Sequence, residues 1–80
     1  MEVFTLNTIS LNKLPMNSSA TVEYINCNNE FRQRMLDLGI IKGSKIIPIL
    51  KSPSGDPVAY EVRGSIIAIR KEDANLISVI

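Results

Sequence analysis

The side chains that most often carry out chemistry in proteins are scarce in this 80-residue chain, which has one cysteine, Cys27, and no histidine. Histidine is the commonest metal ligand and the commonest general base near neutral pH. Without it, the chain cannot build a zinc site of histidine and cysteine ligands or a cysteine nucleophile activated by histidine. A single cysteine cannot form an intramolecular disulfide, which fits a reducing compartment. We expect Cys27 to be an inert thiol.

Gly39 and Gly43-Ser44 have a spacing that superficially resembles a phosphate-binding loop. A P-loop needs Gly-x4-Gly-Lys-Ser/Thr after a strand and before a helix, so that backbone amides and the lysine converge on phosphates. Here the spacing is shorter, and the segment follows a predicted helix and enters a predicted strand. We therefore interpret it as a helix end followed by a turn.

The carboxylates Glu61, Glu72 and Asp73 could bind a hard cation weakly, but neither histidine nor a converging cluster supports a specific transition-metal site. An 80-residue domain buries only roughly 60 to 65% of the surface that its unfolded chain exposes, which leaves little material for an enzyme cleft. We predict no catalytic residues, no specific metal site, no bound cofactor and no enzymatic activity.

Charge and hydropathy exclude two further classes of partner. Nine basic residues are balanced by eight acidic ones, a formal charge of +1, and no block of like charge is present that could neutralise a row of phosphates. The longest apolar run, 46–50, is far shorter than the ~18 to 20 residues of a membrane span, and the N-terminus lacks a secretory signal pattern. We expect one soluble, cytoplasmic domain over residues 1–80, without nucleic acid binding or direct membrane insertion.

One segment, at about 29–38, has the pattern of an amphipathic helix. Phe31, Met35 and Leu38 follow the i, i+4, i+7 spacing that places three apolar side chains on one face. That face must pack against another part of the chain. The rest of the sequence is typical of short strands, so we expect the helix to be an insertion packed on a small sheet.

The ends of this helix are also marked. Asn28 or Asn29 can accept a hydrogen bond from a free backbone N–H at its start. Gly39 stands where a residue of positive φ would close its end, a conformation that only glycine adopts without a Cβ penalty.

The other elements are predicted from alternation of apolar residues and from turn residues. Strands are expected at 20–25, 44–52, 58–62, 65–70 and 77–80, with 2–6 as either a strand or an arm, and single helical turns at 10–14 and 71–76. Five or six short strands joined by hairpins predict a mainly β protein, a small partly closed barrel with a short inserted helix. Closure would remove exposed sheet edges.

The strand at 44–52 is unusual because it is apolar on both faces. Strict alternation places Ile46 and Leu50 on one face, with Ile47 and Ile49 on the other. Pro48 cannot donate a ladder hydrogen bond. The strand is therefore an edge strand, or carries a bulge, or has the backbone nitrogen of Pro48 pointing away from the neighbouring strand.

Five ordered segments carry a resemblance to a known family: Arg34 to Ser44 (RMLDLGIIKGS), Pro53 to Val58 (PSGDPV), Val62-Arg63-Gly64, Ile67 to Ala74 (IAIRKEDA) and Ile77-Ser78-Val79. As a set covering roughly residues 9 to 79, they resemble the FeoA family of small cytosolic proteins associated with bacterial ferrous iron transport. Two positions depart from that family: Asn17, where members often have glycine, and Ile41-Lys42, where a proline is often found.

The resemblance implies an SH3-like β-barrel, a fold shared with the C-terminal domain of iron-dependent repressors. It further implies a non-enzymatic accessory module that contacts the cytosolic side of FeoB, a membrane transporter with a GTP-binding domain. The alternative is an SH3-like regulatory domain in iron-dependent transcriptional control, which the balanced charge and the lack of a helix-turn-helix disfavour. Weak self-association stays open.

An SH3-like barrel raises the question of proline-rich ligands, which need an aromatic-lined groove. We expect Tyr24, Phe31 and Tyr60 to occupy core positions, so such a groove is not predicted. Instead, the helix region carries more apolar residues than docking on a barrel requires, and exposed apolar patches tend to be functional. The candidate partner-binding residues are Met35, Leu36, Leu38, Ile40 and Ile41 and, on the protruding hairpin tip, Pro53, Gly55, Asp56 and Pro57.

Overall fold

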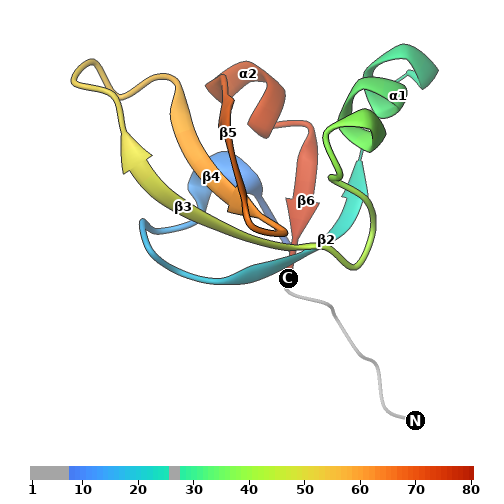
Figure 1. Ribbon diagram of the computed structural model, residues 1–80, viewed down its shortest axis with the longest axis horizontal. Coiled ribbons are helices and arrows are strands. Elements are labelled where there is room, and N and C mark those ends of the chain that lie inside the picture. The colour runs from blue at the N-terminus through green and yellow to red at the C-terminus, as the bar shows by residue number, and fades with distance from the viewer. Residues whose placement is uncertain (1–7, 26–27) are drawn as a thin grey trace, which may run out of the picture.

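The computed structural model describes residues 8–25 and 28–80, so the predictions for Cys27 and for residues 2–6 lie outside the described part of the chain. The described elements, in chain order, are β1 (Ile9–Ser10), the 3-10 helix η1 (Leu11–Lys13), β2 (Ala20–Ile25), α1 (Asn29–Asp37), β3 (Lys45–Lys51), β4 (Val58–Val62), β5 (Ser65–Ile69), α2 (Lys71–Ala74) and β6 (Ile77–Val79). Figure 1 shows α1 inserted between β2 and β3, at the opposite side of the molecule from the turn that joins β3 to β4.

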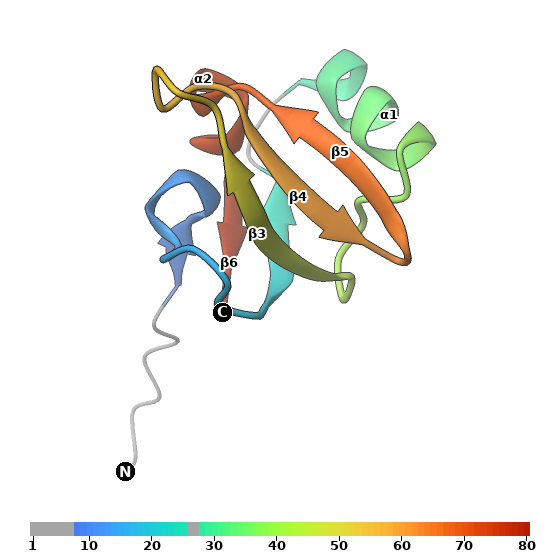
Figure 2. The same ribbon diagram turned by 60° about the vertical axis from the view of Figure 1, so that its left-hand side comes forward.

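The described strands form one antiparallel sheet in the order β1-β6-β2-β3-β4-β5. This confirms the prediction of five or six short strands with a short inserted helix. The sheet is bent, and Figure 2 shows β3, β4 and β5 as a layer in front of β2 and β6. It is not closed, because the two end strands, β1 and β5, do not pair with each other within the described residues.

β3 is an inner strand with a bulge. It lies between β2 and β4, and its register with β4 shifts between Pro48 and Leu50, so the expectation of an edge strand is wrong and that of a bulge is confirmed. The carbonyl oxygen of Pro48 accepts the N–H of Asn17 at 2.7 Å. The extra residue inverts the alternation beyond it. Leu50, expected on the face of the buried Ile46, is therefore 67% exposed.

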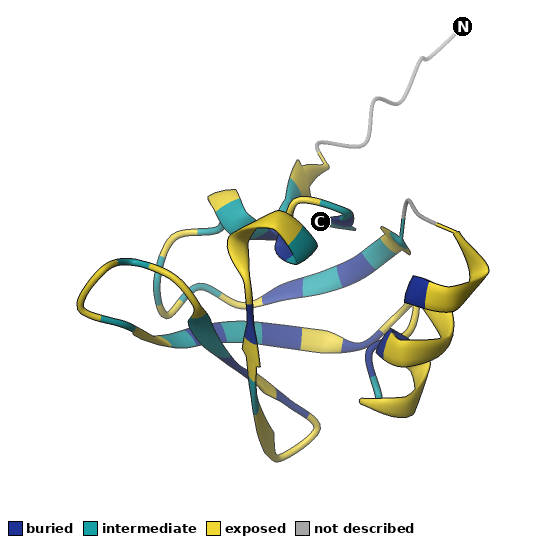
Figure 3. Cartoon of the chain, turned by 90° about the horizontal axis from the view of Figure 1, so that it is seen from above, coloured by how far each residue is buried: buried dark blue, intermediate teal, exposed yellow. Residues whose placement is uncertain are grey.

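The core fills the space between the two halves of the bent sheet. Figure 3 shows the buried segments on facing parts of the strands. The core consists of Leu11, Ala20, Val22, Phe31, Met35, Ile40, Ile46, Tyr60, Val62, Ile69, Ala74, Ile77 and Val79. The core positions predicted for Phe31 and Tyr60 are confirmed.

Leu38 does not belong to this core, and its predicted place on the buried helix face is wrong, because 44% of it is exposed. The α-helix ends at Asp37, and the chain turns through Gly39, whose φ is 87°. The N–H of Gly39 bonds to the carbonyl of Leu36 at 2.9 Å, and that of Ile40 to the carbonyl of Met35 at 2.8 Å. This is a Schellman motif, and it places Ile40, rather than Leu38, in the core.

Replacing Gly39 with alanine should lower the free energy of unfolding by about 1 to 2 kcal/mol, since an L residue is strained in the left-handed region. The added Cβ would meet the Cδ of Arg63 at 3.8 Å, an ordinary contact, so the cost is conformational rather than steric. Urea denaturation measures it. Gly39→Asn is the matched control and should cost less, because asparagine tolerates this conformation. Equal stability of Gly39→Ala and the wild type would contradict the assignment.

Candidate partner-binding surface

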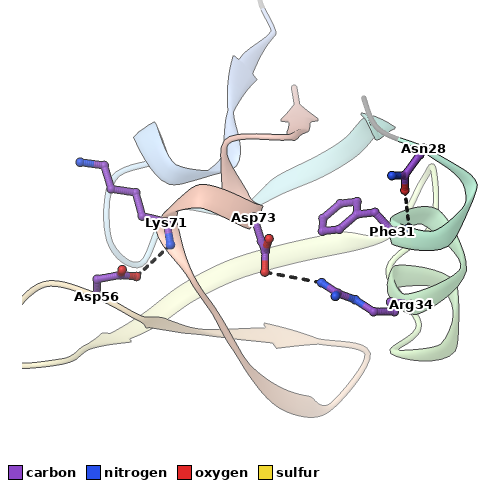
Figure 4. A network of polar contacts seen from close by, with 6 residues as sticks. All are labelled: Asn28, Phe31, Arg34, Asp56, Lys71 and Asp73. Carbon is purple, nitrogen blue, oxygen red and sulfur yellow. Dashed lines mark hydrogen bonds and ion pairs between the residues drawn. The ribbon is translucent and has the colours of Figure 1, made fainter.

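The start of α1 is fixed by a side-chain cap and by a buried aromatic ring. The Oδ1 of Asn28 accepts the N–H of Phe31 at 2.9 Å (Figure 4). Phe31 is 6% exposed and Met35 3%, so these two side chains hold one face of the helix on the core. The next residues around the helix therefore point away from the core. Leu36 is the large apolar residue among them, and it is 51% exposed.

The segment after α1 is held by the hydroxyl of Ser44, a buried polar side chain that is 7% exposed. This hydroxyl donates to the carbonyl of Gly39 at 3.1 Å and accepts the N–H of Ile41 at 3.1 Å. Both bonds fix the turn that reverses the chain into β3. Ile40 is consequently buried on the inner side of this turn, while Ile41 is 36% exposed.

The five helix-region candidates therefore separate into two groups. Met35 and Ile40 are core residues, at 3% and 0% exposure, so the expectation that they are exposed to a partner is wrong. Leu36, Leu38 and Ile41 are available to a partner at 51%, 44% and 36% exposure. The signal that sequence reasoning missed is the Schellman turn, which makes Ile40, the third residue after the helix, continue the buried face in place of Leu38, the C-cap residue.

Leu36 and Ile41 line a groove of about 320 Å³ between α1 and β2, which we call the α1–β2 groove. Its full lining is Glu23, Tyr24, Ile25, Arg32, Leu36, Ile40, Ile41 and Lys42. Apolar and aromatic side chains make up most of the lining, and three charged residues complete it. A mainly apolar groove with a few charged groups is suited to an apolar side chain of a partner.

Tyr24 is the groove residue that sequence reasoning placed wrongly. It was expected in the core because it alternates with buried positions, but it is 51% exposed. The register of β2 with β6 shifts between Val22 and Tyr24. Such a shift inverts the alternation, so Val22 is buried and Tyr24 faces solvent. No local residue type marks this bulge in the sequence.

Arg32 connects the two walls of the groove. Its Nε donates to the carbonyl of Ile25 at 3.1 Å, and its Nη2 lies 3.4 Å from the hydroxyl of Tyr24. The guanidinium carbon lies 5.7 Å from the centre of the Tyr24 ring, within the range of a cation–π contact. These contacts join α1 to β2 and orient the tyrosine, so the groove is formed before any partner binds.

The hairpin tip of residues 53–57 lies far from this groove, at the opposite end of the molecule from α1 (Figure 1). Pro53, Asp56 and Pro57 are exposed, and Gly55 has φ of 92°. The Oδ1 of Asp56 accepts the N–H of Lys71 at 2.8 Å, which caps the start of α2 (Figure 4). The structure therefore does not bring the two predicted contact groups together, and it gives Asp56 a structural contact.

The carboxylates that could have held a cation are dispersed. Asp73 lies 3.6 Å from Arg34 of α1 as an ion pair (Figure 4), and Glu61 is on β4. Within residues 8–25 and 28–80, no group of three or more histidine, cysteine, aspartate or glutamate side chains could hold a metal ion. In the same part of the chain, no helix is both long and apolar enough to cross a membrane.

Burial, and to a lesser extent the negative charge of Asp56, raises the pKa of Tyr60 above its ordinary value of 10.0. The folded state therefore retains this proton longer than the unfolded state, so the stabilisation is complete below pH ~10 and lost as the pH rises through the raised pKa. In a Tyr24→Phe variant, where Tyr60 is the remaining tyrosine, phenolate absorbance should develop above pH ~10. Ionisation at or below that pH would contradict the prediction, and Asp56→Asn should reduce the shift.

Residues 9–80 match the family model of the FeoA domain. A curated relative, the Fe(2+) transport protein A/Fe(2+) transporter FeoB fusion protein of Porphyromonas gingivalis, is 30% identical over 69 residues. The match covers 86% of this chain but 8% of that protein, so the chain spans only a small part of this relative's length.

Two solved structures extend the comparison. A FeoA-like protein of Clostridium acetobutylicum is 33% identical, with a TM-score of 0.85 over 95% of this chain and 88% of that chain. FeoA of Stenotrophomonas maltophilia, determined with zinc and described as an SH3 domain protein, is 29% identical, with a TM-score of 0.79 over 90% of this chain and 89% of that chain. The SH3-like fold expected from the sequence is thereby confirmed.

Proposed function

Because the chain belongs to the FeoA family, we propose that it is a non-enzymatic accessory module of ferrous iron uptake that contacts the cytosolic side of a FeoB-type transporter. The observation that carries this proposal is the relative of Porphyromonas gingivalis, a fusion of Fe(2+) transport protein A and FeoB in one polypeptide. Fusion keeps two modules at a high effective concentration relative to each other. Separate chains reach the same proximity by binding to each other. The proposal places this chain in the cytoplasm.

The α1–β2 groove is the contact surface in this proposal. Tyr24, Leu36 and Ile41 expose apolar area on a single face, and Arg32 holds two of the surrounding elements together. Exposed aromatic and apolar side chains around a depression are typical of the residues that dominate binding energy at interfaces. The hairpin tip lies at the other end of the molecule, so one short partner segment cannot cover both.

The mechanism is binding that differs between two states of the transporter's cytosolic part. A module with no chemistry of its own can change a transporter only by binding one state more tightly, which raises the population of that state. Within the described residues, no set of acid, base or nucleophile is assembled around the groove, whose charged members are Glu23, Arg32 and Lys42. The occupant of the groove is an apolar segment of the transporter.

Uptake of ferrous iron by cells tests the proposal. A strain that lacks this chain should accumulate ferrous iron more slowly, and a copy of the wild-type chain should restore the rate. Leu36→Asp should fail to restore it, because a charge then enters the apolar groove. Leu50→Asp, which alters an equally apolar residue that is 67% exposed on β3, should restore it fully. Unchanged uptake without the chain would overturn the function.

A further inference from the structure

A second concave region is lined by η1 and the residues after it, by the second half of β3 and by β4. It consists of two hollows of about 250 and 170 Å³ whose linings share Asn12, Lys51, Val58 and Tyr60. We call this region the η1 crevice. It has no lining residue in common with the α1–β2 groove.

The charged residues that line the η1 crevice are of one sign. Lys13 and Lys51 line the larger hollow, and Lys51 and Lys71 the smaller one, without any carboxylate in either lining. Asp56 and Glu72 line an adjoining hollow that shares Asn12 and Lys71 with the crevice, and the carboxylate of Asp56 accepts the backbone N–H of Lys71. A crevice lined by three lysines favours a ligand that carries negative charge.

Two polar groups in the crevice are available to a ligand. The Oδ1 of Asn12 is buried and accepts no hydrogen bond from the described residues. Tyr60 as a whole residue is 2% exposed, none of the described hydrogen bonds involves its hydroxyl, and this oxygen is not among the buried unpaired atoms, so it can reach a ligand in the crevice. Buried polar groups in folded proteins are nearly always paired, so the unpaired amide oxygen of Asn12 calls for a molecule that supplies a partner, and the phenol of Tyr60 lies in the same lining. The amide oxygen requires a donor, and the phenol can donate to an anionic oxygen.

The remaining walls are apolar. Leu14, Pro48, Val58 and Ile69 line the crevice between the lysines. An inorganic anion would lose hydration against these walls and would supply no N–H to Asn12. A ligand that matches all three features has an amide N–H, a carboxylate close to it, and an apolar stem.

We propose that the η1 crevice binds a peptide carboxylate. In this arrangement the amide N–H of the bound residue is donated to the Oδ1 of Asn12, and the carboxylate accepts from Tyr60 and the lysine ammonium groups. The carboxylate can belong to the last residue of a chain or to an aspartate side chain, since both combine an N–H with a nearby carboxylate. This inference does not rest on the transporter contact, because the two sites share no residue.

Titration of the isotope-labelled full chain, followed by NMR, tests the proposal with four probes. N-acetyl-leucine carries a terminal carboxylate, N-acetyl-aspartate α-amide a side-chain carboxylate, N-acetyl-leucinamide no charge, and acetate neither amide nor stem. N-acetyl-leucine, N-acetyl-aspartate α-amide or both should shift the amide signals of Asn12, Lys51 and Lys71, and the shifts should saturate. The probe that binds more tightly shows whether the site prefers a terminal or a side-chain carboxylate. The neutral amide and acetate should bind at least fivefold more weakly.

Variants separate this site from general charge attraction. Tyr60→Phe removes only a hydroxyl without a described partner, so the fold should persist while the affinity falls about tenfold. Lys51→Gln should also weaken binding, whereas Lys45→Gln, at the far end of the same strand, should not. Binding of acetate as tight as that of N-acetyl-leucine, unchanged affinity in Tyr60→Phe, or no shifts at tens of millimolar probe would each overturn the proposal.

Discussion

Replacing Ile40 with alanine is expected to lower the free energy of unfolding by about 2 to 5 kcal/mol, and replacing it with aspartate is expected to unfold the protein. Ile40 has 0% exposure and belongs to the core cluster, so alanine leaves a cavity and aspartate buries an unpaired charge. A domain of this size has a total stability of only about 4 to 12 kcal/mol. Urea denaturation followed by circular dichroism measures the first effect, and the NMR spectrum of the aspartate variant shows the second.

The neighbouring residue supplies the control. Ile41 is 36% exposed, so Ile41→Asp should leave the protein folded, with a loss well below that of Ile40→Ala. A folded Ile40→Asp variant would show that this side chain reaches solvent, and the Schellman turn that buries it would then be wrongly placed.

Replacing Leu36 with aspartate is expected to weaken binding to the isolated cytosolic domain of the transporter at least tenfold, without unfolding the chain. Leu36 is 51% exposed in the α1–β2 groove, so its loss costs little in folding, while a charge there must be desolvated in the complex. Isothermal titration calorimetry measures the affinity. Circular dichroism checks that the helix is retained.

Two further variants serve as comparisons for the Leu36→Asp result. Leu50→Asp makes the same change on an exposed residue outside the groove and should bind as the wild type does. Tyr24→Ala should weaken binding if the tyrosine contributes to the same contact surface. Full affinity of Leu36→Asp would refute the groove as the contact surface, although the chain could still bind the transporter elsewhere.

Much of the architecture could be predicted from local patterns. Helix α1 was predicted from the spacing of Phe31 and Met35, an asparagine cap and a terminal glycine, all of which act within a few residues of one another. The hairpins followed from turn residues, such as Gly64 with φ of 85°. These features depend on local backbone preferences, so a single sequence is sufficient to reveal them.

The errors arise where tertiary pairing overrides local alternation. Bulges in β2 and β3 direct Tyr24 and Leu50 to solvent. No residue near Tyr24 marks the first bulge, and Pro48 indicates the second only as one of three alternatives. The exposure of Leu38 and the burial of Ile40 follow from the geometry of one turn. Which of the candidate residues Leu38 and Ile40 is available to a partner therefore depends on the geometry of this turn.

NMR mapping of the labelled chain, as the isolated cytosolic domain of a FeoB-type transporter is added, tests whether the α1–β2 groove is the contact surface. We expect saturable shifts of the backbone signals of Tyr24, Arg32, Leu36 and Ile41, with little change at residues 53–57. Shifts confined to the hairpin tip would move the contact surface to the other end of the molecule. No shifts at concentrations above those of both proteins in the cell would contradict direct contact with that domain.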